Sequence, residues 1–331
     1  MSAQFKIKAA DPASVVRLER ELGLPRFIAA TLVARGIDNP AAVHRFLAPS
    51  LERDWLDPYI IPGLSDVADA LEAAVKRGDH ILVFGDFDLD GISATTVLTR
   101  GLRALGAQAT PFIPLRFEEG YALSQAASTR ACSFGPDFIV TVDCGIACKA
   151  EAAAVVEAGL GLAITDHHEP VDLVPEGVPV ADPKCDANCP SSILAGVGVA
   201  LKLVQVLGGR LGQPHLWRDF TDFATLGTVA DLMPMRDENR ALVSDGIARM
   251  NAAPPPCLAA LLATSGAADN PVSATNIRFS GLPRPNAAGR LGDAPLAPDL
   301  LMTDAFQEAH RLATHLDSVH DHGRAPSPSP S

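Results

Sequence analysis

The stretch His80–Gly91, HILVFGDFDLDG, decides the fold, because an apolar run stops there at a series of alternating aspartates. Ile81–Phe84 is short, apolar and bounded by a glycine, which is typical of a buried strand. Comparable runs recur along the chain at Ala109–Ile113, Phe138–Val142, Leu162–Thr165 and Val178–Ala181. Helical patterns such as Ser93–Leu105 and Ala147–Ala158 lie between most of them. Strands that alternate with helices predict an α/β fold with a mainly parallel sheet flanked by helices.

The segments outside this core predict a division into further parts. Residues 1–75 form an expected N-terminal helical segment, and 76–250 form the expected catalytic domain with its Rossmann-like sheet. Residues 251–323 should hold a linker and a long connecting helix over Pro295–His320. The low-complexity end, RAPSPSPS at 324–331, predicts a disordered tail. Later helices are expected at Leu194–Leu207, Phe220–Thr228 and Asn239–Asn251.

Composition narrows the class of protein. Hydrophobic residues make up 47% of the chain, the start has no apolar leader, and no stretch is long enough to span a bilayer. We therefore expect a cytoplasmic protein with no membrane contact. The net charge of −12 is unusual for a nucleic-acid binder, which normally carries a basic face. A cluster of metal-bound carboxylates would account for several of these charges.

Acidic and imidazole side chains follow the expected strands repeatedly. The first strand runs into Asp86, Asp88 and Asp90, the third into Asp143, and the fourth into Asp166-His167-His168, while Asp231 ends the apolar run before it. Ligands of open parallel sheets bind beyond the carboxyl ends of the strands. So many carboxylates in one place are unfavourable unless cations neutralise them. Mixed Asp and His ligands favour two Mn²⁺ or Mg²⁺ ions, a pair that activates water for phosphoryl displacement.

Rival interpretations of these motifs are weaker. An EF-hand loop starting at Asp86 needs a glutamate at its twelfth position, where Val97 stands. The six cysteines include two pairs, Cys144 with Cys148 and Cys185 with Cys189, whose spacing lacks the usual form of a zinc knuckle. Free thiols are the alternative that we prefer for them. An aspartate at a strand end can also be a simple helix N-cap, so no single acid decides the function.

With Asp166-His167-His168 in place, the chain resembles the DHH phosphoesterase superfamily, and within it the RecJ-type single-strand-specific exonucleases. The resemblance runs from about residue 20 to about 318 and rests on several motifs. These are ILVFGDFDLDG (81–91), RFEEGYALS (116–124), DCGI (143–146), the DHH triplet, LAGVGVA (194–200), LGTVAD (226–231) and LPRPNAAGRLGDA (282–294).

The resemblance implies roles for the matching acids and imidazoles. Asp88 and Asp90 should each hold one metal ion, and Asp143 should bridge the two ions. His167 and Asp231 should complete the second ion's site, and Asp86 should either be a further ligand or lie just behind the ligands. His168 should contact the scissile phosphate as part of the catalytic set, and Asp166 should orient the neighbouring imidazoles. Phe84 stands where some members of the superfamily have a histidine ligand.

The resemblance also implies contacts with a nucleic-acid strand. Arg116 and Tyr121 match positions that touch the strand, and Arg284 and Arg290 are expected as basic side chains beside the cleft. The implied activity is 5′-to-3′ exonuclease cleavage of single-stranded DNA in repair and recombination. A single-strand-binding protein is an expected partner. Relatives continue into a second catalytic-side domain (DHHA1), and many add an oligonucleotide-binding barrel; we expect both to be absent from this chain.

Three hypotheses about function therefore remain at this point. The first is a metal-dependent single-strand exonuclease, as the resemblance implies. The second is a phosphodiesterase for short oligonucleotides or cyclic dinucleotides, which the acidic net charge favours. The third is an inactive, C-terminally truncated core that acts as an interaction module.

Overall fold

A computed structural model describes residues 8–264, 271–278 and 296–324. The chain divides into two compact units, one of Met1–Trp55 with Met235–Ala241 and one of Leu56–Pro234 with Leu242–Ser331. The helices of the first unit's amino-terminal part are α1 (Pro12–Leu22), α2 (Arg26–Ala34), α3 (Pro40–Leu47) and α4 (Leu51–Asp54). Asp11 and Asn39 cap α1 and α3 through their side chains, and a proline follows each cap, as is usual at helix starts. The expected helical character of this region is confirmed.

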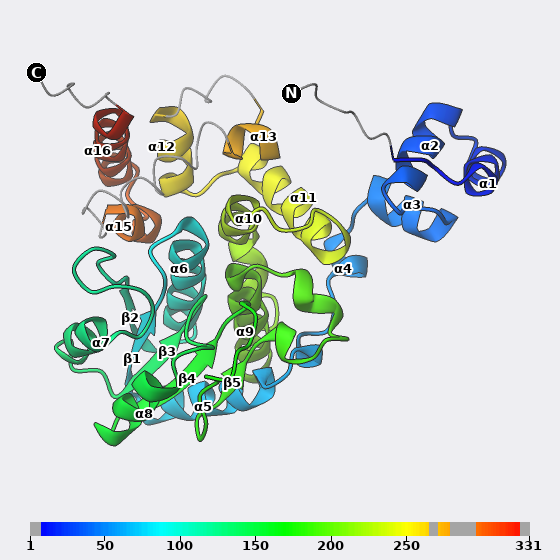
Figure 1. The fold of residues 1–331 in the computed structure, drawn as a ribbon. Helices are drawn as coiled ribbons and strands as arrows, with labels where there is room; N and C mark the ends of the chain where they lie inside the picture. Colours follow the sequence, from blue (N-terminus) through cyan, green and yellow to red (C-terminus); the bar gives the residue numbers. More distant parts are fainter. Residues whose placement is uncertain (1–7, 265–270, 279–295, 325–331) are drawn as a thin grey trace, which may run out of the picture. The chain divides into compact units, whose positions relative to one another are not determined.

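The second unit is built on a parallel sheet (Figure 1). Its strands are β1 (His80–Phe84), β2 (Gln108–Phe112), β3 (Phe138–Thr141), β4 (Gly161–Thr165) and β5 (Val180–Ala181). The order across the five-stranded sheet is β2-β1-β3-β4-β5, and every pair of neighbours is parallel. The predicted α/β fold with a parallel sheet is therefore confirmed.

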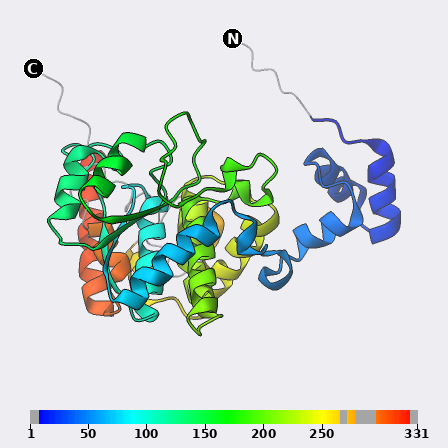
Figure 2. The same ribbon diagram turned by 90° about the horizontal axis from the view of Figure 1, so that it is seen from below.

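Helices cover both faces of this sheet (Figures 1 and 2). Leu82 and Phe84 of β1 belong to a buried cluster with residues of α7 (Gln125–Cys132) and α8 (Lys149–Glu157). On the other face, α5 (Leu64–Arg77), α6 (Leu89–Ala104) and α9 (Gly196–Arg210) contact the strands and one another. Because both faces are covered, the central strands β1, β3 and β4 consist mostly of buried apolar residues.

The order of the strands places a topological switch point between β1 and β3. The chain leaves β1 towards β2 on one side and returns to β3 on the other, so β1 and β3 are neighbours that connect in opposite directions. Such a switch point opens a crevice beyond the carboxyl ends of the two strands. Asp86, Asp88 and Asp90 follow β1, and Asp143 follows β3, so these acids, which are expected to bind metal, lie at the switch point.

The remaining helices lie after β5 in the sequence. Their bounds are α10 (Thr221–Ala230), α11 (Asp237–Ala252), α12 (Pro256–Thr264), α13 (Ala274–Asn276), α15 (Leu296–Met302) and α16 (Phe306–Arg324). Short 3₁₀ turns occur at Pro58–Ile60, Pro183–Cys185, Pro190–Ile193 and Leu216–Phe220. Among the helices of the described residues, none combines the length and the apolar character needed to cross a membrane.

The predicted long C-terminal helix is present as α16, but its expected bounds, Pro295–His320, are wrong because α15 and α16 are separate helices. In a continuous helix the amide of Ala305 would donate to the carbonyl of Leu301. Instead this amide donates to Thr303 Oγ1 at 3.3 Å, and the Leu301 carbonyl accepts from Nε and Nη2 of Arg100 at 3.1 and 2.9 Å. Arg100 on α6 therefore stabilises the break. Apart from Arg324, the predicted disordered tail lies outside the described residues.

Replacement of Arg100 by alanine should loosen this end of the molecule. Its guanidinium also donates to Asp304 at 2.8 Å, and the variant leaves the Leu301 carbonyl without that donor. We expect Arg100→Ala to lower the free energy of unfolding by roughly 1–3 kcal/mol, measured by urea denaturation. Arg311→Ala is the control, because Arg311 pairs with Glu308 on the exposed side of α16 and should change nothing measurable. Equal effects of the two variants would contradict this role of Arg100.

Candidate metal centre

The turn between β1 and α6 holds its aspartates in different ways. Asp88 is the N-cap of α6, and its Oδ1 accepts from the amides of Asp90 and Gly91 at 2.8 and 3.0 Å. Asp88 is thus a helix N-cap, which the sequence left as an alternative to metal binding. Its side chain also lies in one group of possible metal ligands, together with Asp86 and Asp143. Asp86 is buried, and its Oδ1 has no hydrogen-bond partner within the described structure.

Asp90 is held by a second helix. Its two carboxylate oxygens accept from the amides of Gly196 and Val197, at 2.7 and 3.0 Å, at the start of α9. These amides are donors that the first turn of a helix leaves free, and they suit a negative charge. Asp90 is thereby fixed in one orientation although it is almost completely buried.

Asp143 needs an unusual backbone and a close glycine. Its φ of +61° lies in the left-handed region, which side chains other than glycine, asparagine and aspartate rarely adopt. A Cβ atom on Gly196 would overlap the carboxylate of Asp143, and one on Gly227 would overlap that of Asp90. Gly196 and Gly227 therefore lie in close packing that admits two acids of the centre.

The DHH triplet gives each of its residues a distinct task. Asp166 Oδ1 accepts from Nδ1 of His168 at 2.7 Å, and its Oδ2 accepts from the amide of Ile146 at 2.9 Å. His167 donates its Nδ1 proton to the carbonyl of Leu194 at 3.1 Å, since a carbonyl can only accept. That tautomer leaves a lone pair on Nε2 of His167, the atom that faces the acids. The predicted orienting role of Asp166 agrees with this geometry for His168.

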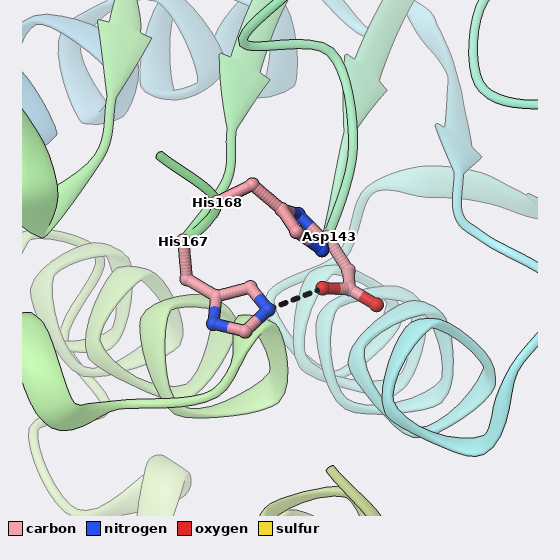
Figure 3. A group of neighbouring side chains, drawn as sticks. All are labelled: Asp143, His167 and His168. Atoms are coloured by element: carbon pink, nitrogen blue, oxygen red, sulfur yellow. Dashed lines mark ion pairs between the residues drawn. The ribbon is translucent and has the colours of Figure 1, made fainter. Parts of the chain in front are cut away.

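Three overlapping groups of ligand atoms result, and within each group the atoms lie no more than 4.8 Å apart. The first group is Asp86, Asp88 and Asp143; the second is Asp90, His167 and Asp231; the third is Asp143, His167 and His168. Nε2 of His167 lies 3.0 Å from Oδ1 of Asp143 (Figure 3). The same nitrogen lies 3.7 Å from Oδ2 of Asp90 and 3.8 Å from Oδ2 of Asp231. Asp143 thus joins the first group to the imidazole of the second.

The electrostatics of the centre call for a cation. Burial raises the pKa of Asp143 and of Asp90, and neighbouring carboxylates raise both further. Burial and the charge of Asp88 raise the pKa of Asp86 to about 7. Burial and the neighbouring His168 lower the pKa of His167 to about 4, so its imidazole is neutral near pH 7. Carboxylate oxygens and a neutral imidazole that converge in this way fit divalent ions such as Mn²⁺ or Mg²⁺.

A second set of side chains lies beside the first group. The guanidinium of Arg116 stacks over the ring of Phe87 at 4.5 Å, and Tyr121 meets the same ring edge-on at 6.0 Å. Tyr121 is 54% exposed, so its ring is available to a ligand. The ion pair between Glu119 and Arg130 anchors the loop that carries Arg116 and Tyr121. Arg284 and Arg290, the other predicted strand contacts, lie outside the described residues.

Sequence reasoning missed two polar residues at the last strand. Asp182 follows β5 directly, is buried, and has an Oδ2 without a hydrogen-bond partner in the described part of the chain. Burial raises the pKa of Asp182 to about 7. The signal was present in Val180-Ala181-Asp182, because an acid again follows an apolar run. The second residue is Lys184, two positions after Asp182.

The cysteines take no part in this centre. Among the described residues, none of them belongs to a group of possible metal ligands.

Comparisons with known proteins agree with this centre. The DHH family, N-terminal domain, matches residues 80–228, which contain every acid and imidazole of the centre except Asp231. The single-stranded-DNA-specific exonuclease RecJ of Bacillus subtilis (strain 168) is 36% identical over 318 residues, which cover 96% of this chain and 40% of the relative. The relative of the same name from Escherichia coli (strain K12) is 32% identical over 96% of this chain and 56% of its own length.

A solved structure extends the likeness to three dimensions. The crystal structure of RecJ in complex with Mn²⁺ from Thermus thermophilus superposes with a TM-score of 0.81 at 33% identity, over 95% of this chain and 45% of that one. The chain thus spans about half the length of the curated relatives it matches. The matched domain, the sequence identity along nearly the whole chain and the shared fold together show that this chain belongs to the DHH family, as a RecJ-type member.

Proposed function

We propose that this chain carries the two-metal catalytic centre of a nuclease that hydrolyses phosphodiester bonds in single-stranded DNA. The observation that carries the proposal is that three groups of possible ligands, linked through Asp143 and His167, meet at the switch point of the sheet. Relatives named single-stranded-DNA-specific exonucleases and a related structure in complex with Mn²⁺ support it. The 5′-to-3′ direction, the cytoplasmic location and the single-strand-binding partner stay predictions.

The two ion sites divide the ligands as follows in this proposal. Asp86, Asp88 and Asp143 would hold the first ion, whereas Asp90, His167 and Asp231 would hold the second, with Asp143 shared. Two divalent cations in such a site polarise the phosphate and lower the pKa of a coordinated water. The buried Oδ1 atoms of Asp86 and Asp143 lack hydrogen-bond partners in the described structure. Each is therefore suited to coordinate a cation.

The protein's own side chains would then position the strand and its phosphate. The hydrogen bond from Nδ1 of His168 to Asp166 raises the pKa of His168, which favours the cationic form that binds a phosphate oxygen. The guanidinium of Arg116 offers a second phosphate contact. The exposed ring of Tyr121, which meets Phe87 edge-on, offers a face on which a base can stack, and an unpaired base offers its own face most readily.

Loss of one charge at Asp143 should abolish cleavage. We choose Asp143→Asn because asparagine tolerates the left-handed backbone of this position, so the fold is kept. With Mn²⁺ and a 5′-labelled single strand, we expect a rate at least about 100-fold below that of the unchanged chain. Asp79→Asn is the matched control, because Asp79 pairs with Arg77 at the amino end of β1. Cleavage by Asp143→Asn at the full rate would refute the proposal.

The same substitution should have the opposite effect on metal-free stability. Without ions, Asp143→Asn removes one of several buried carboxylates that repel each other, so the free energy of unfolding should rise by roughly 1–3 kcal/mol. Addition of Mn²⁺ should raise the melting temperature of the unchanged chain more than that of the variant. Thermal unfolding in a chelator and in Mn²⁺ measures both effects. A variant less stable than the unchanged chain in the chelator would contradict the assumed repulsion.

A second candidate function is a phosphodiesterase for short oligonucleotides or cyclic dinucleotides. The net charge of −12 favours it, because a long polyanion approaches such a chain less readily than a short one. Turnover of a dinucleotide and of a long single strand, compared at equal phosphate concentration, separates the two functions. We expect the long strand to be the better substrate, and a preference for the dinucleotide would support the second candidate.

A further inference from the structure

Basic side chains follow the two edge strands of the sheet, and the metal centre lies between them. The acids and imidazoles of the centre follow β1, β3 and β4, with Asp231 added from the end of α10. Arg116 follows β2 at one edge, and Lys184 follows β5 at the other. A strand laid across the carboxyl ends of these strands would meet a cation on each side of the centre.

The backbone of Lys184 is held firmly in place. Thr165 of β4 pairs with Ala181 of β5, so the residues that follow these two strands start side by side. Asp182 caps the 3₁₀ turn Pro183–Cys185, and its Oδ1 accepts from the amide of Lys184 at 2.7 Å. The position of Lys184 is therefore set by the sheet and by a buried side chain.

The ammonium group of Lys184 lies at the rim of the centre. Nζ is 3.2 Å from Oε1 of Glu169, the residue directly after His168. The side chain of Lys184 is 24% exposed, whereas that of Glu169 is 79% exposed. Burial is the largest cause of the lowered pKa of His167 and of the raised pKa of Asp231, which are both in the second group. The positive charge of Lys184 is a smaller cause, and it acts to lower both pKa values. In the first group, burial is the largest cause of the raised pKa of Asp86, and the positive charge of Arg116 acts to lower this pKa.

We propose that Lys184 is a phosphate-binding residue of this site, which holds the nucleic-acid strand on the side opposite Arg116. The proposal rests on the function proposed above and adds a residue to it. In this arrangement the ammonium group leaves Glu169 and pairs with a phosphate next to the scissile one. An exposed carboxylate is a weak partner, because solvent screens the pair, so a phosphate of the strand can replace it.

A purely structural role is the rival explanation, and the two roles predict different signs. If the pair with Glu169 only pinned the loop between β4 and β5, Lys184→Ala and Glu169→Gln would weaken the protein in the same way. If Lys184 binds phosphate, Lys184→Ala should weaken strand binding, whereas Glu169→Gln should strengthen it by freeing the ammonium group. Lys184→Arg keeps the charge and should keep most of the binding.

The test measures binding of a fluorescent single-stranded oligonucleotide by anisotropy, with every chain carrying Asp143→Asn so that the strand stays intact. We expect Lys184→Ala to raise Kd about 3- to 30-fold and to reduce the slope of log Kd against log salt by about 0.7, the value for one phosphate contact on a single strand. Glu169→Gln should lower Kd. Lys76→Ala is the matched control, since Lys76 also pairs with a glutamate, Glu72, but on α5 near the amino end of β1.

Two results of the binding measurement would overturn the proposal. One is a Kd and salt slope for Lys184→Ala equal to those of Lys76→Ala. The other is weaker binding by both Lys184→Ala and Glu169→Gln together with equal falls in melting temperature. The proposed function is tested separately, by cleavage of a single strand in Mn²⁺ by the chain that keeps Asp143. Absence of cleavage there would contradict the proposed function. Cleavage that is indifferent to Lys184→Ala, at low strand concentration, refutes the inference about Lys184 alone.

Discussion

Repulsion among buried carboxylates is the constraint on which this structure depends. Asp86, Asp90 and Asp143 lie in the interior, and burial raises the pKa of each of them. The neutral imidazole of His167 directs a lone pair at the same space and supplies no compensating charge. The fold tolerates the arrangement through two amides at the start of α9 and through glycines that make room for the side chains. Positive charge from bound ions would turn this unfavourable cluster into a stable one.

Sheet topology explains how residues so distant in sequence meet. Apart from Asp231, which is the C-cap of α10, the acids of the centre follow strands, and parallel pairing brings the carboxyl ends of those strands together. Three helices complete the centre. The helix α6 begins after Asp88, and α10 ends with Asp231 as its C-cap. The helix α9 begins at Gly196, whose amide donates to Asp90. The core determines where the strands end, and the loops beyond the strands determine the chemistry.

Periodic features were predictable from the sequence, and features that depend on contacts between distant segments were not. The strands and their terminal acids follow from apolar runs that stop at Asp86, Asp143 and Asp166. The start of α6 at Leu89 instead of Ser93 follows from the cap at Asp88, which a periodicity argument does not weigh. The break between α15 and α16 depends on Arg100, a residue some 200 positions earlier in the chain. The carbonyl of Leu194 that orients His167 has no side-chain signature at all.

The helix α6 connects two distant parts of the second unit. Asp88 and Asp90 stand at its first turn, and Arg100, about 15 Å further along the axis, binds the turn between α15 and α16. One secondary-structure element thus carries two acids of the centre and the contact that separates the last two helices.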